Sequence, residues 1–272
     1  MIIAVLIIII EILAVGIIHI DGLADTFDGL FSYAKKEKML EIMKDSRIGT
    51  NGAVILILYF ITKTVLTSEI IMINPKYLII CPIIARLSTP INAGLSNYAR
   101  KSGMSNAIIS ENGIFEAIFS LALSIILVFY IIGIKGIITI FIAFIFIIIF
   151  MLNVRKKIDG ITGDTMGACL ELTSILVLFL GTFLAFIIFK VHPIFTAAIR
   201  KYDDINASLQ ENINGIRVVK AYIREKYETG KFKKATENLK NMLLKGENII
   251  IFVSPVMQLT VFSCILLLSW FG

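Results

Sequence analysis

The stretch that decides the fold is "GIITIFIAFIFIIIFML", residues 136–152, an apolar run without a charged residue. It is too long for an ordinary β-strand, and a helix that spans a bilayer needs about 20 mostly apolar residues. Inside a bilayer each backbone polar group must also be bonded within the protein, which a helix achieves on its own. The run therefore predicts a transmembrane helix.

Similar runs recur along the whole chain. Its 272 residues are 57% hydrophobic and 17% charged, with a mean hydropathy of +0.89. This composition is too apolar for an ordinary soluble domain. The sequence predicts an all-α fold, a polytopic α-helical integral membrane protein of about six to seven spans. The expected spans are residues 1–18, 53–73, 77–94, 114–133, 136–152, 168–189 and 249–271.

Lysine and arginine collect in three long polar connections, residues 19–52, 95–113 and 153–167. Alternating spans place these connections on one side of the membrane, and the positive-inside rule makes that side cytoplasmic. We expect a multi-pass protein of the cell (plasma) membrane whose polar motifs face the cytoplasm. The net charge of +6 does not require a nucleic-acid partner, because cytoplasmic connections of membrane proteins collect lysine and arginine.

Three aspartates follow the first apolar run, in "HIDGLADTFDG". Asp21, Asp25 and Asp28 are spaced so that a helix places them on one face. Three like charges on one face repel one another, whereas a divalent cation between them reverses that effect. Carboxylates are the hard oxygen ligands that Mg²⁺ prefers. The motif therefore predicts a magnesium site.

Two further stretches supply related side chains. "KEKMLEIMKDSRIGTNG" contains Asp45 as a further metal ligand and Arg47 as a bidentate partner for a phosphate oxygen. "GITGDTMGACLEL" contains Asp164 at the entrance of a span, where a glycine-rich helix start offers backbone N–H groups to phosphate. We expect both stretches to meet the first motif at one membrane face.

A second group of residues is predicted to bind substrate. Arg86 belongs to it because a charge inside a span, here between Pro82 and Pro90, indicates a helix that faces the bundle interior. Three members could instead have structural roles. His19 could anchor the chain at the membrane interface, Arg100 could determine the topology, and Glu171 could pair with a buried arginine. The group consists of His19, Gly22, Gly29, Ser46, Arg86, Arg100, Gly163, Thr165 and Glu171.

The order and spacing of these motifs resemble the cobalamin (5'-phosphate) synthase family, also called adenosylcobinamide-GDP ribazoletransferases, over residues 1–185. The resemblance implies a membrane transferase of vitamin B12 assembly. Such an enzyme joins adenosylcobinamide-GDP to α-ribazole or its 5'-phosphate, releases GMP and requires Mg²⁺. It would use as catalytic residues Asp21, Asp25, Asp28, Asp45 and Arg47, and as metal ligands the same aspartates with Asp164. Arg47 and Arg100 would stabilise the charge on the leaving GMP.

Two features depart from the family pattern. Family members carry several tens of residues before the position where this chain begins, so we expect the family's N-terminal segment to be missing. The family also often has an acid at the position of Ser174.

The C-terminal part resembles a different family. "PIFTAAIRKYDDINASLQENINGIRVVKAYIREKYETGKF" is similar to the intracellular helical extension in the membrane domain of an ABC exporter. In exporters such an extension lies in the cytoplasm. Here the span over residues 168–189 would start on the cytoplasmic side, so the residues that follow it would lie outside the cell. We therefore expect a junction near Phe189 and two domains, a cobalamin-synthase-like catalytic domain at residues 1–189 and an exporter-like fragment at 190–272.

Three alternatives to the ribazoletransferase remain open. The chain could be a membrane component of an ABC transporter, although it has no G-x-x-x-x-G-K-[ST] phosphate loop, or an inactive gene-fusion fragment. It could also resemble a CDP-alcohol phosphatidyltransferase, but "DGLADTFDG" does not reproduce the pattern of those enzymes, an Ala-Arg pair soon after the first Asp-Gly and later acids in G-x₃-D-x₃-D spacing. The sequence leaves open whether the chain forms a homo-oligomer.

Overall fold

The computed structural model describes residues 1–100, 103 and 105–271, with the side chains at 108, 110, 184–191, 218, 249–250 and 252–271 left aside. Over these residues the elements are helices, joined by one isolated β-bridge between Tyr98 and Ile161. The all-α prediction is confirmed. The chain divides into two compact units, Met1–Phe183 and Leu184–Gly272.

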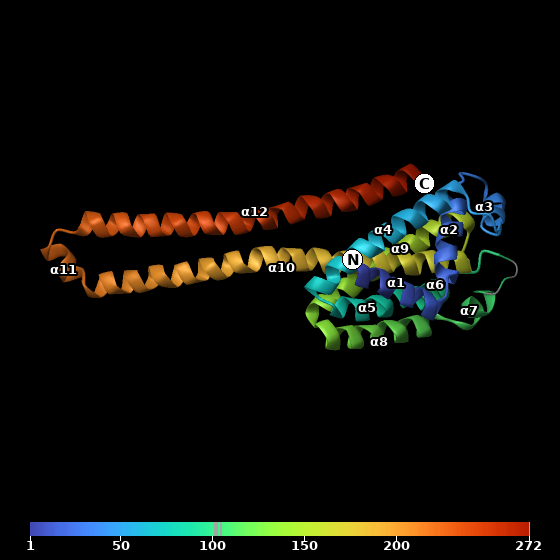
Figure 1. Cartoon of the computed structure of the whole chain (residues 1–272), viewed down its shortest axis with the longest axis horizontal. Coiled ribbons are helices and arrows are strands. Elements are labelled where there is room, and N and C mark those ends of the chain that lie inside the picture. The colour runs from blue at the N-terminus through green and yellow to red at the C-terminus, as the bar shows by residue number, and fades with distance from the viewer. Residues whose placement is uncertain (101–102, 104, 272) are drawn as a thin grey trace. The chain divides into compact units, whose positions relative to one another are not determined.

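The first unit is a helical bundle (Figure 1). Its interior is aliphatic, with Ile80, Ile84 and Ile147 fully buried, because helices that are apolar all round pack against one another. Its helices are α1 (Ile2–Val15), α2 (Ile18–Leu30), α3 (Lys36–Ile42), α4 (Thr50–Ile73), α5 (Lys76–Arg86), α6 (Ser88–Leu95), α7 (Ser105–Glu111), α8 (Ile114–Ile132), α9 (Ile134–Ile158) and the start of α10 (Gly163–Asn214).

Within the described residues, five helical segments are long and apolar enough to cross a membrane. They are Thr50–Ile73, Lys76–Leu95, Ile114–Ile132, Ile134–Ile158 and Gly163–Phe183. A sixth span results if α1 and α2, which are bent by 94°, are taken together. These segments confirm a polytopic membrane protein. The seventh expected span, residues 249–271, falls in α12 (Glu225–Phe271), mostly among the side chains left aside.

The first span was expected to run to residue 18, and this boundary was wrong. The helix α1 ends at Val15, and Gly16 adopts a φ of +83°, which favours glycine at a helix end. The chain then turns into α2. The aspartate motif is therefore a separate helix, outside the five apolar spans, that packs against α3 and α4.

The second unit is a helical hairpin made by the later part of α10, the short α11 (Ile216–Ala221) and α12 (Figure 1). Gly246 of α12 lies against Phe195 of α10, where an added Cβ would come within 2.9 Å of the ring. Near the turn, Asn212 donates a hydrogen bond of 3.3 Å to Glu228.

Candidate functional site

Helix α2 crosses the start of α10 at a close backbone contact. An added Cβ on Gly22 would lie 2.8 Å from the carbonyl oxygen of Asp164, and one on Gly167 would lie 3.1 Å from the Cα of His19. Two glycines, one from each helix, thus let the backbones touch. The contact brings the first and third motifs together, although about 140 residues separate Gly22 from Asp164 in the sequence.

Around this crossing lie Asp21, Asp25 and Asp164, which we call the acidic cluster. The pKa of Asp25 is raised to about 7, first by burial and then by the negative charges of Asp21, Asp164 and Asp28, while Arg100 lowers it. A shift of this kind requires the charges to be close to one another. The cluster therefore concentrates negative charge that one arginine compensates only in part.

Arg100 comes from the connection after α6. Its Nη2 lies 2.7 Å from Oδ2 of Asp164, and the two side chains are 13% and 25% exposed. Its Nε is buried and has no hydrogen-bond partner within the described part of the chain. Arg100 therefore holds the connection on α10 and keeps an unused donor beside the acidic cluster. Its neighbour Lys101 lies outside the described residues.

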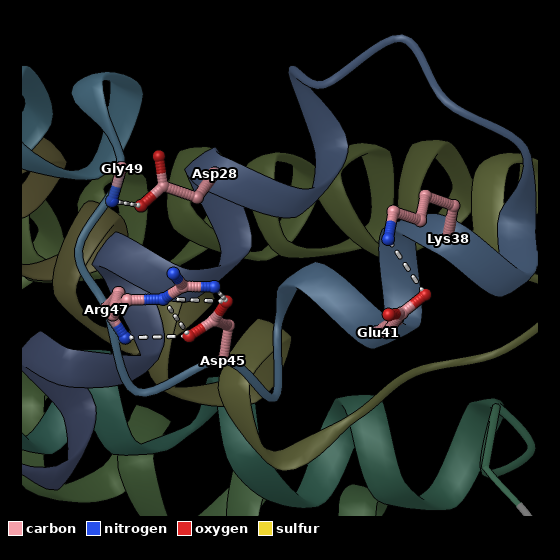
Figure 2. Close-up of polar contacts among 6 residues, drawn as sticks. All are labelled: Asp28, Lys38, Glu41, Asp45, Arg47 and Gly49. Atoms are coloured by element: carbon pink, nitrogen blue, oxygen red, sulfur yellow. Dashed lines mark hydrogen bonds and ion pairs between the residues drawn. The ribbon is translucent and has the colours of Figure 1, made fainter.

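Asp28 has a different environment from the acidic cluster. Its Oδ2 accepts a hydrogen bond of 2.7 Å from the N–H of Gly49 (Figure 2). Its Oδ1 accepts one of 2.8 Å from the N–H of Gly52. An added Cβ on either glycine would collide with this carboxylate. Because Gly49 and Thr50 begin α4, Asp28 caps that helix from α2. It was expected to bind metal, but both of its oxygens accept these bonds.

Asp45 and Arg47 pair with each other on the connection between α3 and α4 (Figure 2). Nη2 of Arg47 lies 2.7 Å from Oδ2 of Asp45, with the arginine side chain 86% exposed. The hydrogen bonds from Arg47 lower the pKa of Asp45 to about 2. Ser46 between them is exposed. Both carboxylate oxygens of Asp45 accept hydrogen bonds from Arg47, and its part in a metal shell stays a prediction.

Three residues that were expected to bind substrate have contacts within the protein. Thr165 is buried and exchanges hydrogen bonds with Thr162, so the pair caps the start of α10. Gly29 packs against Met43 of the α3 region, and Gly163 lies against Ser105. At these two glycines, as at Gly22, an added Cβ would meet neighbouring protein atoms within 3 Å, so close packing already accounts for the small residue.

Glu171 lies about two turns beyond Asp164 along α10 and is buried. It accepts a short hydrogen bond from the Tyr59 hydroxyl, and Lys63 Nζ lies 3.5 Å from its Oε2. Lys63 also donates to Tyr59, at 2.7 Å, and to Glu11, at 2.9 Å. The partner of Glu171 is therefore a lysine and not the arginine considered from the sequence. We call Glu11, Tyr59, Lys63 and Glu171 the buried network.

The sequence reasoning missed Glu11, Tyr59 and Lys63. The signal was present, because "IIIIEILAV" and "YFITKTVL" each place one charge inside an apolar run. Such residues mark functional sites in membrane segments by default. The network borders a cavity of about 290 Å³. Arg86 lies at the same cavity and is exposed.

The donors of the acidic cluster fit a divalent cation. They are hard carboxylate oxygens, and the pKa of Asp25 is raised first by burial and then by the negative charges of its neighbours. In the described part of the chain, however, no three His, Cys, Asp or Glu side chains are already arranged around a common point as metal ligands. The chemistry of the residues suits Mg²⁺, and their present arrangement is not a preformed metal shell.

Comparisons with known proteins find two families. The model described as cobalamin-5-phosphate synthase matches residues 1–182, and that of the ABC transporter transmembrane region matches residues 102–272. The exporter resemblance is confirmed, but it begins well before residue 190 and overlaps the first match. No solved structure matches the chain.

Several relatives are named adenosylcobinamide-GDP ribazoletransferase. The chain is 40% identical to one from Clostridium novyi (59% of this chain, 65% of the relative) and 36% identical to one from Fusobacterium nucleatum (65% and 72%). It is 38% identical to one from Clostridioides difficile (65% and 74%). The chain thus spans roughly two thirds to three quarters of the length of these relatives, and the aligned part covers about two thirds of the chain itself.

Proposed function

We propose, from the premise that this chain belongs to the cobalamin-5-phosphate synthase family, that it is an adenosylcobinamide-GDP ribazoletransferase. It would join adenosylcobinamide-GDP to α-ribazole or its 5'-phosphate and release GMP. The observation that carries the proposal is the meeting of α2 with the start of α10, which places the acidic cluster and Arg100 at one site inside the matched residues.

The reaction exchanges one phosphorus–oxygen bond for another. A ribose hydroxyl oxygen of the ribazole bonds to the cobinamide-side phosphorus, and the bond from that phosphorus to the bridging oxygen breaks. This hydroxyl is not the one at the 5' position, because the 5'-oxygen of the 5'-phosphate substrate is already esterified. The bridging oxygen leaves with GMP, and the hydroxyl proton passes to a carboxylate of the acidic cluster. Catalysis of such a transfer is largely positioning and charge neutralisation. Arg100, with its unused Nε–H donor, would stabilise the charge on GMP.

Mg²⁺, when bound, would neutralise charge on the diphosphate. Asp21, Asp25 and Asp164 would hold it, Asp164 through the oxygen that does not pair with Arg100. Both carboxylate oxygens of Asp28 already accept bonds from backbone amides, and both of Asp45 accept bonds from Arg47. Asp45 and Arg47, which pair with each other, are given no role in binding the metal or the substrates here.

The active site would face the cytoplasm from the plasma membrane. Basic residues support this orientation, because Arg155, Lys156 and Lys157 end α9 directly before the start of α10 that carries Asp164. Lysine and arginine near the ends of spans mark the cytoplasmic side.

The test is GMP release by membranes that contain the chain, given adenosylcobinamide-GDP and α-ribazole. We expect formation of GMP and of the ribazole-linked corrinoid in equal amounts with Mg²⁺, and neither with EDTA. Absence of GMP from correctly inserted protein would overturn the proposal.

The match to the ABC transporter transmembrane region favours a second candidate, a membrane component of a transporter. This chain would then need a partner that hydrolyses ATP, because its sequence lacks the phosphate loop. ATP hydrolysis by a co-purified partner, without GMP release, would support this candidate over the first.

A further inference from the structure

We propose that the cavity bordered by the buried network is the binding site for the aromatic base of the nucleoside substrate. The cavity is lined by residues of α1, α4, α5 and α10 and by Ile20 of α2. This inference rests on the proposed function and names the part of the protein that would recognise one of its two substrates.

The volume of the cavity indicates which of the two substrates could enter it. Pockets for drug-sized ligands have volumes of about 300–1,000 Å³. A volume of about 290 Å³ lies at the lower end of that range. It suits one heterobicyclic base and is far too small for a corrinoid with its nucleotide.

The lining suits a flat aromatic group that carries a ring nitrogen. Leu78, Leu170 and Leu178 supply apolar walls for the faces of the ring. Lys63 supplies a buried donor, because an ammonium group has three N–H bonds and two of them are engaged by Glu11 and Tyr59. Lys63 also forms an ion pair with the Glu171 carboxylate, but the distance of 3.5 Å is longer than an ordinary N–H···O bond of about 2.7–3.2 Å. A ring nitrogen that enters the cavity would therefore compete only with this longer contact for the third N–H.

The cavity also lies at the right depth relative to the acidic cluster. Asp164 and Glu171 are both on α10, and seven residues at a rise of 1.5 Å each separate them by about 10 Å. This is comparable to the reach of a nucleoside from a ribose hydroxyl to the far edge of its base. Ile20, which lines the cavity, directly precedes Asp21 in α2. A base in the cavity therefore places the ribose, with its reacting hydroxyl, on the side of the acidic cluster.

The test uses substitutions that make the cavity smaller, and it measures the KM for each of the two substrates separately. In Leu170→Phe the larger ring occupies part of the space for the base, so the KM for α-ribazole should rise about tenfold or more. The KM for adenosylcobinamide-GDP should stay within about twofold. Leu178→Phe is a second variant at the same cavity. The matched control is Leu123→Phe on α8, whose side chain is 46% exposed, and it should change neither constant.

The outcomes separate this inference from the proposed function. If the wild-type chain releases GMP and both cavity variants leave the KM for α-ribazole unchanged, the inference is overturned while the function stands; a cavity occupied by a lipid chain gives this result. If the wild-type chain releases no GMP, equilibrium binding of α-ribazole to the purified protein decides the question. Binding that Leu170→Phe weakens and Leu123→Phe leaves intact supports the site, and absence of binding contradicts it.

Discussion

Four aspartates of this protein lie in four different environments. Asp25 is half-buried among other carboxylates and has a raised pKa, whereas Asp45 is paired with Arg47 and has a lowered one. Asp28 accepts two backbone hydrogen bonds, and Asp164 forms an ion pair with Arg100. The role of each aspartate therefore follows from its neighbours and not from its place in a motif.

Asp28 is predicted to act mainly on stability. In Asp28→Ala the N–H groups of Gly49 and Gly52 lose their acceptor, and removal of a helix cap costs about 0.5–2 kcal/mol. We expect a lower midpoint of thermal unfolding in detergent. Asp28→Ser, which keeps a capping oxygen, should recover part of the loss. An unchanged midpoint in Asp28→Ala would show that the cap contributes nothing.

At the level of helices, the site depends on one close crossing. Gly22 of α2 contacts the backbone of Asp164, and Gly167 of α10 contacts that of His19. Side chains larger than hydrogen at these positions would separate the helices. The crossing therefore fixes the distance between the aspartates of α2 and the one on α10.

Gly22→Ala tests the crossing. The new methyl group would lie 2.8 Å from the Asp164 carbonyl oxygen, and such overpacking typically costs about 1–3 kcal/mol. We expect a loss of GMP release together with a lower unfolding midpoint. Gly230→Ala in α12 is the matched control, because an added Cβ there meets nothing within 4 Å and alanine favours a helix. Equal behaviour of the two variants would contradict the account.

Much of this level could be predicted from the sequence. The apolar runs predict the spans, because length and hydropathy alone decide whether a helix can cross a bilayer. The meeting of the aspartate motif with Asp164 also follows from topology, since the connections that carry them lie on the same side.

Pairings between distant side chains could not be predicted. Asp28 and Gly49 are 21 residues apart, and Tyr59 and Glu171 are 112 apart. Residue type restricts what each can bind, but only packing selects the partner. The close helix contact at Gly22 could not be predicted either. A glycine is expected both where an anion approaches the backbone and where two helices touch, so the residue type does not distinguish the two cases.

The whole molecule consists of two compact units, and the exporter-like match, which begins at residue 102, extends over both. The acidic cluster, Arg100 and the buried network all belong to the unit Met1–Phe183. The cobalamin-5-phosphate synthase match ends at residue 182, and the exporter-like match runs to residue 272. The proposed chemistry therefore needs no side chain from the second unit.

A chain that ends at Phe183 is predicted to keep the transferase activity. It retains every residue assigned to the acidic cluster and to the cavity. We expect GMP release per inserted molecule within about threefold of the full chain, less than 1 kcal/mol in barrier height. Membrane insertion should be measured in parallel. Loss of activity from properly inserted protein would show that the second unit contributes to the site.

The central claim is that the acidic cluster, and not the whole set of motif aspartates, carries the Mg²⁺-dependent transfer. The most direct measurement is the rate of GMP release at saturating Mg²⁺ for Asp25→Asn and Asp45→Asn in matched membranes. Asp25→Asn should lower the rate by about a hundredfold or more, whereas Asp45→Asn, which alters an exposed pair, should lower it less than about tenfold. Equal losses in the two variants, or the reverse order, would contradict the account.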